Sequence, residues 1–354
     1  MTKHILLALS FLCIFAGMNC KKNPVAPPPP NNNDTTSNNF TFQTFAFGGN
    51  AGSCMFNDVA IISPTDIWAV GAVYLDSADG APDPFPYNAA HWDGNSWTLM
   101  KITVQTKYGP VTAPFYGIVA FSSNDIWISS GLPIHGDGAN WTQYDLYTMG
   151  VLGSNDGYLT RAWGSSSRNI YFVGTSGSIV HYANGSWSKI TSGTSLQFND
   201  IYGSGVQILA VCLQFDPPGG EIFSIQGNTA TLISSSPIQG DQLYGIWFIP
   251  NQRYDLALDF GGIYEKRSLS DTGWVPLEIT GAATTGVRGN SVNDIVVVSA
   301  TGDLLQWNGV VWKSFRNQTG LAGNSYARVA ISGNVVIAVG VNGTQAAITM
   351  GMRQ

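Results

Sequence analysis

Aspartates and arginines recur at matching places along this chain, and they are the first candidates for chemistry. Asp58 and Asp200 stand at equivalent places in two copies of a repeated motif, with Arg161 and Arg328 in two other copies. Two carboxylates at a set separation are what glycoside hydrolysis requires. The same four side chains can instead line and hydrate the central channel of a ring-shaped fold. The sequence leaves both interpretations open.

Motifs of other catalytic classes do not occur in the sequence. There is no Gly-x-Ser-x-Gly elbow, no His-Glu-x-x-His pair and no phosphate-binding glycine loop. Glutamates are scarce, with only Glu221, Glu265 and Glu278 along the chain. We therefore assign no catalytic residue and expect a binding protein, with a carboxylate-dependent glycoside hydrolase as one alternative.

Four long segments between predicted strands concentrate aromatic and acidic residues. They span residues 72–89, 101–114, 142–159 and 214–221. In a ring of blades these connections open on one face, and loops on a rigid scaffold commonly carry binding residues. Aromatic rings beside carboxylates suit sugar rings or a protein hot spot, unless the segments are merely tolerated insertions. The candidate ligand-binding residues are Tyr74, Phe85, Tyr87, Tyr108, Tyr144, Tyr147, Tyr158, Asp76, Asp83 and Asp145.

A calcium ion is the one cofactor that the sequence suggests. Asp76, Asp79 and Asp83 give the first long segment a high acidic density, but their spacing is not that of an EF-hand. Metal-binding cysteine spacing is also missing. We predict no other metal or cofactor.

A short sequence motif that recurs seven times predicts the strands that position these residues. In its fullest copy an apolar run from Phe56 meets a Ser-Pro-Thr-Asp turn, a second run follows, and the copy closes on a glycine turn and Trp97. Such runs predict consecutive antiparallel strands, and recurrence at roughly 40 to 60 residues predicts propeller blades. The copies begin near Phe56, Phe115, Thr160, Phe198, Tyr244, Thr285 and Tyr326. We therefore predict an all-β, seven-bladed β-propeller.

The histidines beyond the leader occupy one position of the repeat. His91, His135 and His181 each stand six residues before a tryptophan, and Gln306 stands six before Trp312. A residue type repeated once per blade predicts a structural role, either bonding a turn or packing on that tryptophan. Because separate blades hold these side chains apart, we do not expect a shared metal site.

The ends of the chain predict how the ring closes. The seventh repeat stops one strand short of four, and an alternating strand at 40–45 precedes the first repeat. Placing this strand at the outer edge of the seventh blade completes the count and removes an open edge. An independent strand on another surface is the alternative.

The first 39 residues predict export and anchoring. The apolar stretch 5–16 is too short to span a bilayer, and Cys20 follows it after small or polar neighbours. This resembles a bacterial lipoprotein signal peptide at 1–19, which implies cleavage before Cys20 and lipidation of its thiol; an ordinary secretory signal is the alternative. Residues 20–39 then form a Pro- and Asn-rich tether, and 40–354 form a single propeller domain.

Two motifs of the first repeat carry a family resemblance. Asp66-Ile67-Trp68-Ala69-Val70-Gly71 and Trp92-Asp93-Gly94-Asn95-Ser96-Trp97 resemble the blades of uncharacterised β-propeller lipoproteins of Bacteroidetes-type cell envelopes. The resemblance covers the chain from about residue 40 to its end. It implies an outer-membrane lipoprotein, on either the surface or the periplasmic side.

The amino-acid composition argues against nucleic acid as a binding partner. A net charge of −6 and only 11% charged residues give no basic footprint for nucleic acid. Cys54 and Cys212 fall in distant blades, so no disulfide between them is expected. We expect a monomeric domain, held to the membrane by its lipid, that binds a glycan through the face of long segments. A protein-interaction scaffold in an envelope complex is the alternative.

Overall fold

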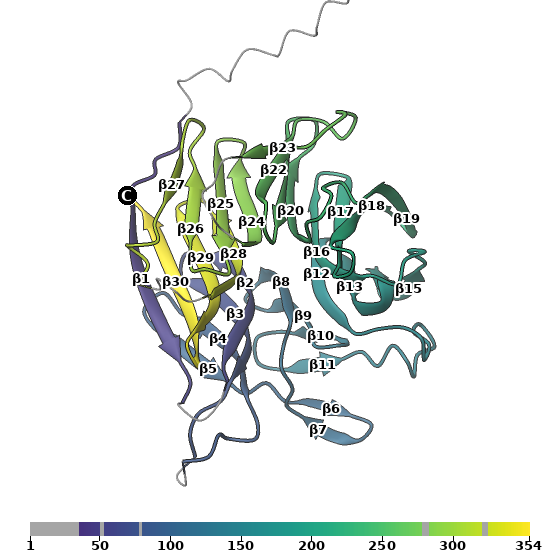
Figure 1. Ribbon diagram of the computed structural model, residues 1–354. Coiled ribbons are helices and arrows are strands. Elements are labelled where there is room, and N and C mark those ends of the chain that lie inside the picture. Colours follow the sequence, from purple (N-terminus) through teal and green to yellow (C-terminus); the bar gives the residue numbers. More distant parts are fainter. Residues whose placement is uncertain (1–34, 50–52, 78–79, 278–282, 321–324) are drawn as a thin grey trace, which may run out of the picture.

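The protein is a closed ring of seven four-stranded antiparallel sheets (Figure 1). The computed structural model describes residues 35–49, 53–77, 80–277, 283–320 and 325–354. The predicted all-β, seven-bladed β-propeller is confirmed. The signal peptide 1–19, Cys20 and most of the tether lie outside the described residues. Within the described ranges, no helix has the length and apolar character that crossing a membrane requires.

Each of the first three blades runs from an innermost strand at the axis to an outermost strand. Blade 1 contains β2 (Met55–Ser63), β3 (Asp66–Val73), β4 (Tyr87–Trp92) and β5 (Trp97–Met100). Blade 2 contains β8 (Gly117–Ser122), β9 (Asp125–Ser129), β10 (Pro133–Gly136) and β11 (Trp141–Gln143). Blade 3 contains β12 (Leu159–Ser166), β13 (Asn169–Gly174), β14 (Ile179–Ala183) and β15 (Ser186–Ile190), with the 3-10 turn η1 (Thr175–Gly177) after β13.

The remaining four blades follow the same order. Blade 4 contains β16 (Gln197–Ser204), β17 (Gln207–Gln214), β18 (Gly219–Gln226) and β19 (Thr229–Ser235). Blade 5 contains β20 (Leu243–Ile249), β21 (Arg253–Leu258), β22 (Gly262–Lys266) and β23 (Val275–Leu277). Blade 6 contains β24 (Thr284–Ser291), β25 (Asp294–Ser299), β26 (Leu304–Trp307) and β27 (Trp312–Ser314). Blade 7 contains β28 (Ser325–Ser332), β29 (Val335–Asn342), β30 (Gln345–Arg353) and β1 (Phe40–Phe47).

Blade 7 closes the ring with the N-terminal strand, as the sequence predicts. β1 pairs with β30 along its whole length, from Phe40 opposite Arg353 to Phe47 opposite Ala346. Phe40 packs edge-on against Phe315 of the neighbouring blade, with ring centroids 5.6 Å apart. The first and last strands of the domain are thus neighbours in one sheet, and β30 is not left as an open edge.

The two faces of the ring differ in their connections. The loop face, as we call it, carries the connections between blades and those between second and third strands, including 74–86, 101–116 and 144–158. The turn face carries the tight turns between first and second strands, such as 64–65 and 123–124. Every innermost strand begins at the loop face and ends at the turn face, because strands alternate in direction within each blade.

The structure corrects the extent of two long segments. Residues 101–114 contain an additional hairpin, β6 (Val104–Thr106) and β7 (Gly109–Val111), which lies below blade 2 in Figure 1. Segment 214–221 is mostly strand, because β17 and β18 leave only residues 215–218 between them. A long connection at 267–274, which the sequence analysis did not single out, lies on the turn face.

A β-bulge near the start of the innermost strand repeats around the ring. Register shifts separate Phe56 from Asp58, Phe198 from Asp200 and Tyr326 from Arg328, and blades 3, 5 and 6 have the same irregularity. A bulge re-aims the side chain that follows it. The residues that follow the bulge are Asp58, Arg161, Asp200, Gly245, Gly286 and Arg328.

The repeated histidines fasten the second and third strands of their blades. Nε2 of His135 lies 2.9 Å from Oδ1 of Asp125, and its ring stacks on Trp127 at 4.2 Å. His91 and His181 make the matching contacts, and Nε2 of Gln306 donates to Asp294 at 2.9 Å in blade 6. The predicted bond to the turn is confirmed. The ring, however, stacks on the aromatic residue of the second strand, not on the tryptophan six residues later.

Candidate functional site

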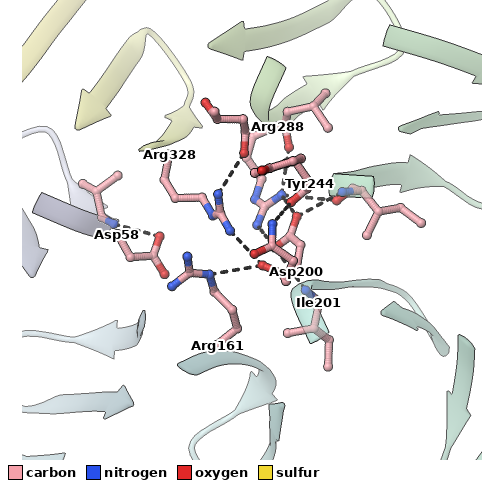
Figure 2. Close-up of polar contacts among 12 residues, drawn as sticks. Asp58, Arg161, Asp200, Ile201, Tyr244, Arg288 and Arg328 are labelled. Carbon is pink, nitrogen blue, oxygen red and sulfur yellow. Dashed lines mark hydrogen bonds and ion pairs between the residues drawn. The ribbon is translucent and has the colours of Figure 1, made fainter. Parts of the chain in front are cut away.

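Charged side chains from five blades meet in the central channel (Figure 2). Asp200 of β16 accepts hydrogen bonds from Nη1 and Nη2 of Arg288 at 2.9 and 2.8 Å. It also accepts the backbone N–H of Ile246, at 3.0 Å. Burial works to raise the pKa of Asp200, but the Arg288 guanidinium outweighs it and holds that pKa below its ordinary value. The Asp200 carboxylate is therefore a paired anion.

Asp58 has a different environment at the equivalent place in blade 1. Its two oxygens accept the backbone N–H groups of Val59 at 2.9 Å and Ile118 at 3.2 Å. Burial raises the pKa of Asp58, although three channel arginines work against that rise. Its bond to Ile118 joins blade 1 to blade 2, as Asp200 joins blade 4 to blade 5 through Ile246.

Arg161 of β12 bridges the neighbouring blades through their carbonyl groups. Its Nε donates to the carbonyl of Asn199 at 3.2 Å. Nη1 donates to the carbonyls of Thr160, at 3.0 Å, and Tyr116. Burial lowers the pKa of Arg161, and the Asp58 and Asp200 carboxylates oppose that effect. Arginine after a bulge thus binds backbone carbonyls, where aspartate binds backbone N–H groups.

Arg328 of β28 completes the channel cluster. It donates to the carbonyls of Thr285 and Asn199 at 2.8 and 2.7 Å. Burial, together with the nearby Arg161 guanidinium, lowers the pKa of Arg328 to about 9. Its Nε is buried and has no hydrogen-bond partner among the described residues.

The structure brings together the four channel residues that the sequence analysis named, and it adds a fifth, Arg288. Three arginines face two aspartates, so the cluster carries one excess positive charge when all five are ionised. Because Asp58 and Asp200 are engaged with backbone N–H groups of the next blade, their visible role is to hold blades together. This arrangement matches the structural interpretation of the channel better than the hydrolytic one.

A groove opens on the loop face beside blade 2. It encloses about 440 Å³ between the β6–β7 hairpin and the strands β10 and β11. Its apolar lining includes Val104, Val111, Phe115, Leu132 and Ile134. At the rim, Nζ of Lys107 lies 3.1 Å from Oδ2 of Asp145. The groove therefore combines an apolar floor with a polar rim.

The predicted aromatic residues separate into exposed and structural groups. Tyr108, Tyr158 and Phe85 are 87%, 67% and 57% exposed. Tyr144 instead packs against Trp127 and Trp187 inside blades 2 and 3. The other three are also held: Tyr74 packs on the core of blades 1 and 7, Tyr87 lies beneath the ammonium of Lys101, and the Tyr147 hydroxyl donates to the carbonyl of Asp156.

The predicted acidic residues already have partners. Asp83 binds Lys101 and accepts the backbone N–H of Phe85 at 3.0 Å. Asp145 binds Lys107 and accepts the hydroxyl of Thr148 at 2.7 Å. Asp76 forms a bridge with Pro82. In the described ranges no three His, Cys, Asp or Glu side chains gather as metal ligands, and Asp79 lies outside them, so calcium binding stays a prediction.

Several exposed side chains on the loop face were missed by the sequence analysis. Tyr116, Met149, Phe215 and Phe260 all lie in its connections and are exposed. Phe260 stands in a connection of three residues, so loop length gave no signal for it. Phe215 lies in segment 214–221, which was predicted to be a long loop, but it was not among the predicted binding residues. Cys54 and Cys212 are both buried free thiols, and burial raises the pKa of Cys212.

The fold and channel define a seven-bladed β-propeller, and comparison with known proteins adds the following. No family model and no curated protein matches the chain. Among solved structures it is similar to YCF48 bound to D1 peptide, at 14% identity and a TM-score of 0.65 over 90% of this chain and 99% of that one.

Two further solved structures are similar at the level of fold. One is a catalytically inactive virginiamycin B lyase from Staphylococcus aureus with quinupristin, at 10% identity and a TM-score of 0.65, covering 88% of this chain and 99% of that one. The other is the WD40 propeller domain of Doa1, at 11% identity and a TM-score of 0.63, covering 89% of this chain and 97% of that one. At these identities the similarity establishes the fold alone.

Proposed function

We propose that this propeller binds an extended segment of a partner protein on its loop face. The observation that carries the proposal is the groove beside blade 2, where Val111 and Phe115 line an apolar floor and Lys107 stands at the rim. Apolar pockets with a few polar groups are the usual form of a specific binding site. The volume, about 440 Å³, suits one or two apolar side chains of a peptide.

The state of the acidic residues favours a peptide over a sugar. Sugar recognition was expected to use carboxylates as acceptors for hydroxyl groups, but Asp83 and Asp145 are bonded to Lys101 and Lys107. A peptide that buries apolar side chains needs no such acceptor. YCF48, which is similar in fold, was solved with a peptide, and this agrees with the proposal.

Display of a random peptide library against the purified protein tests this function. We expect enrichment of peptides with apolar side chains, and loss of their binding when Val111→Asp places a charge in the groove. Val206→Asp is the matched control, because Val206 is 97% exposed on a turn of the opposite face. Failure to enrich any peptide, or equal loss in both variants, would contradict peptide binding by the groove.

Glycan binding is the second candidate, and the exposed rings of Tyr108, Tyr158 and Phe85 favour it. Such rings provide flat apolar faces for sugar rings. A glycan array, probed with and without a calcium chelator, separates it from the peptide proposal. Specific sugar binding that Tyr108→Ala abolishes would support it, and sensitivity to the chelator would point to Asp76, Asp79 and Asp83. A negative array on protein that binds peptides would reject it.

We further propose that the domain is an envelope lipoprotein, anchored through Cys20 to the outer membrane. The course of β1 suggests how the domain is oriented relative to the membrane. Phe40 pairs with Arg353 at the turn face, so the chain enters the domain on the side opposite the groove. The loop face would then point away from the membrane. Mass spectrometry of the mature N-terminus tests the anchor, and a Cys20→Ser variant that stays membrane-bound would contradict it.

A further inference from the structure

A second hollow lies where the loop face meets the central channel. It encloses about 320 Å³ and reaches the innermost strands of blades 1, 3 and 4. Asn57, Tyr116, Tyr158, Thr160, Arg161 and Asn199 line it. Arg161 is the only charged side chain among its lining residues, so the hollow presents a cation to the loop face.

Arg161 has donor capacity left over. Its Nε and Nη1 are bonded to backbone carbonyls, whereas Nη2 makes no hydrogen bond to any residue that the structure describes. A guanidinium offers five N–H donors, and the two on Nη2 are left to donate to a carboxylate oxygen. Arg161, which lines the hollow, therefore has two N–H donors without a partner among the described residues.

The charge balance of the channel favours an anion of single charge. Asp200 is neutralised by Arg288, which leaves Asp58 to face both Arg161 and Arg328 (Figure 2). A buried positive charge without a counter-charge is costly, and an added anion relieves that cost. A monoanion restores neutrality, while a dianion such as phosphate would leave an excess negative charge beside Asp58.

We propose that this hollow is a seat for a carboxylate of the bound partner segment, either its C-terminal carboxylate or an Asp or Glu side chain, held by Arg161. The seat deepens the proposed peptide-binding function and rests on it. The groove beside blade 2 would take apolar side chains of the segment, and the seat would take its charge. Phe115 and Tyr116 are neighbours in the chain, and Phe115 lines the groove while Tyr116 lines the hollow.

Short probes test the seat without the partner. Saturation-transfer NMR would compare acetyl-triglycine with a free C-terminus, acetyl-Gly-Asp-Gly-amide, acetyl-triglycine-amide and inorganic phosphate. We expect one or both carboxylate peptides to bind and the uncharged amide not to bind; the free C-terminus and the acidic side chain are thereby distinguished. Binding of phosphate alone, or of no probe, overturns the proposal.

Two substitutions assign the binding to Arg161. Arg161→Gln is expected to weaken binding of the carboxylate peptide at least tenfold. Arg168→Gln, which removes one positive charge from an exposed turn on the opposite face, should leave binding within twofold. Arg161→Lys keeps the charge and loses the planar guanidinium, so it guards against a Gln variant that does not fold, and intermediate affinity is expected. Unchanged binding in a folded Arg161 variant overturns the seat.

The proposed carboxylate site and the proposed groove can be rejected independently of each other. If peptides selected by the library bind the Arg161→Gln variant as tightly as the unmodified protein but lose binding with Val111→Asp, the seat is wrong and peptide binding stands. If the carboxylate probes bind at Arg161 while the library yields nothing, the segment-binding function is wrong, and with it the carboxylate's proposed source.

Discussion

Asp200 and Arg288 form a two-bonded ion pair that passes over the innermost strand of blade 5. The two residues are 88 positions apart in the chain, in blades 4 and 6. Between them lies Ile246 of blade 5, whose N–H is accepted by Asp200 and whose carbonyl accepts from Arg288 at 3.2 Å. The ion pair therefore holds three successive blades at the channel.

Replacing Asp200 by Asn should strongly destabilise the ring. The substitution keeps the shape of the side chain but leaves the Arg288 guanidinium without its counter-charge. Breaking a buried ion pair from one side costs about 3 to 5 kcal/mol of unfolding free energy. Urea unfolding would measure the loss, with Asp216→Asn, at an exposed carboxylate, as the control. A loss below about 1 kcal/mol, the level of an exposed pair, would show that the pair does not hold the blades.

The same pair predicts a defined pH dependence. The pKa of Asp200 is lowered in the folded protein, so its contribution to stability is present above the unfolded pKa of about 3.9 and is lost as pH falls through the folded value. The difference in unfolding free energy between the unmodified protein and Asp200→Asn should be constant from pH 8 to about 5. It should then shrink as pH falls below about 4. A difference that grows in acid would have the wrong sign.

Removal of β1 should open the ring. Without residues 36–47 the edge of β30 is unpaired and Phe315 loses its contact with Phe40. We expect a chain that begins at residue 48 to unfold at lower temperature and to aggregate through the exposed edge. A chain that begins at residue 36 is the control and should melt like the unmodified protein. Equal melting of the two chains would mean that β1 does not contribute to closure.

The repeated histidine has its own control within the sequence. His135→Ala loses both the bond to Asp125 and the stacking on Trp127, and should cost about 1 to 2 kcal/mol of unfolding free energy. His135→Gln should cost less, because Gln306 makes the equivalent bond to Asp294 in blade 6. Calorimetry on both variants checks the order. If Gln is as costly as Ala, the hydrogen bond is not what this position supplies.

The repeat made the fold predictable, since a strand pattern that recurs seven times needs only local periodicity to be read. The repeat also made four channel residues predictable, because each stands at the matching position in its copy of the motif: Asp58, Arg161, Asp200 and Arg328. Arg288 was not, since it stands two residues further along its strand, beyond Gly286. Side chains two apart share one side of a strand, so Arg288 reaches the channel beside a glycine that leaves the space free.

Loop length marked the two segments that border the groove, 101–114 and 142–159, but it did not predict the shape of the groove, because one wall is a hairpin inside the first segment. Val104 and Val111 on either side of a turn with Gly109 were the available signal. Tyr144 was assigned to binding because the buried Leu146 and Leu152 in the same connection were not recognised as core. The calcium and lipid predictions depend on Asp79 and Cys20, outside the described residues.

Affinity measurements on matched surface variants test peptide binding by the loop face most directly. Isothermal titration of a library-selected peptide into the unmodified protein, Val111→Asp and Val206→Asp compares one charge on each face. We predict binding at least tenfold weaker in Val111→Asp and unchanged in Val206→Asp, with identical melting temperatures. Equal affinity for all three proteins would contradict the assignment of the binding site to the groove of the loop face.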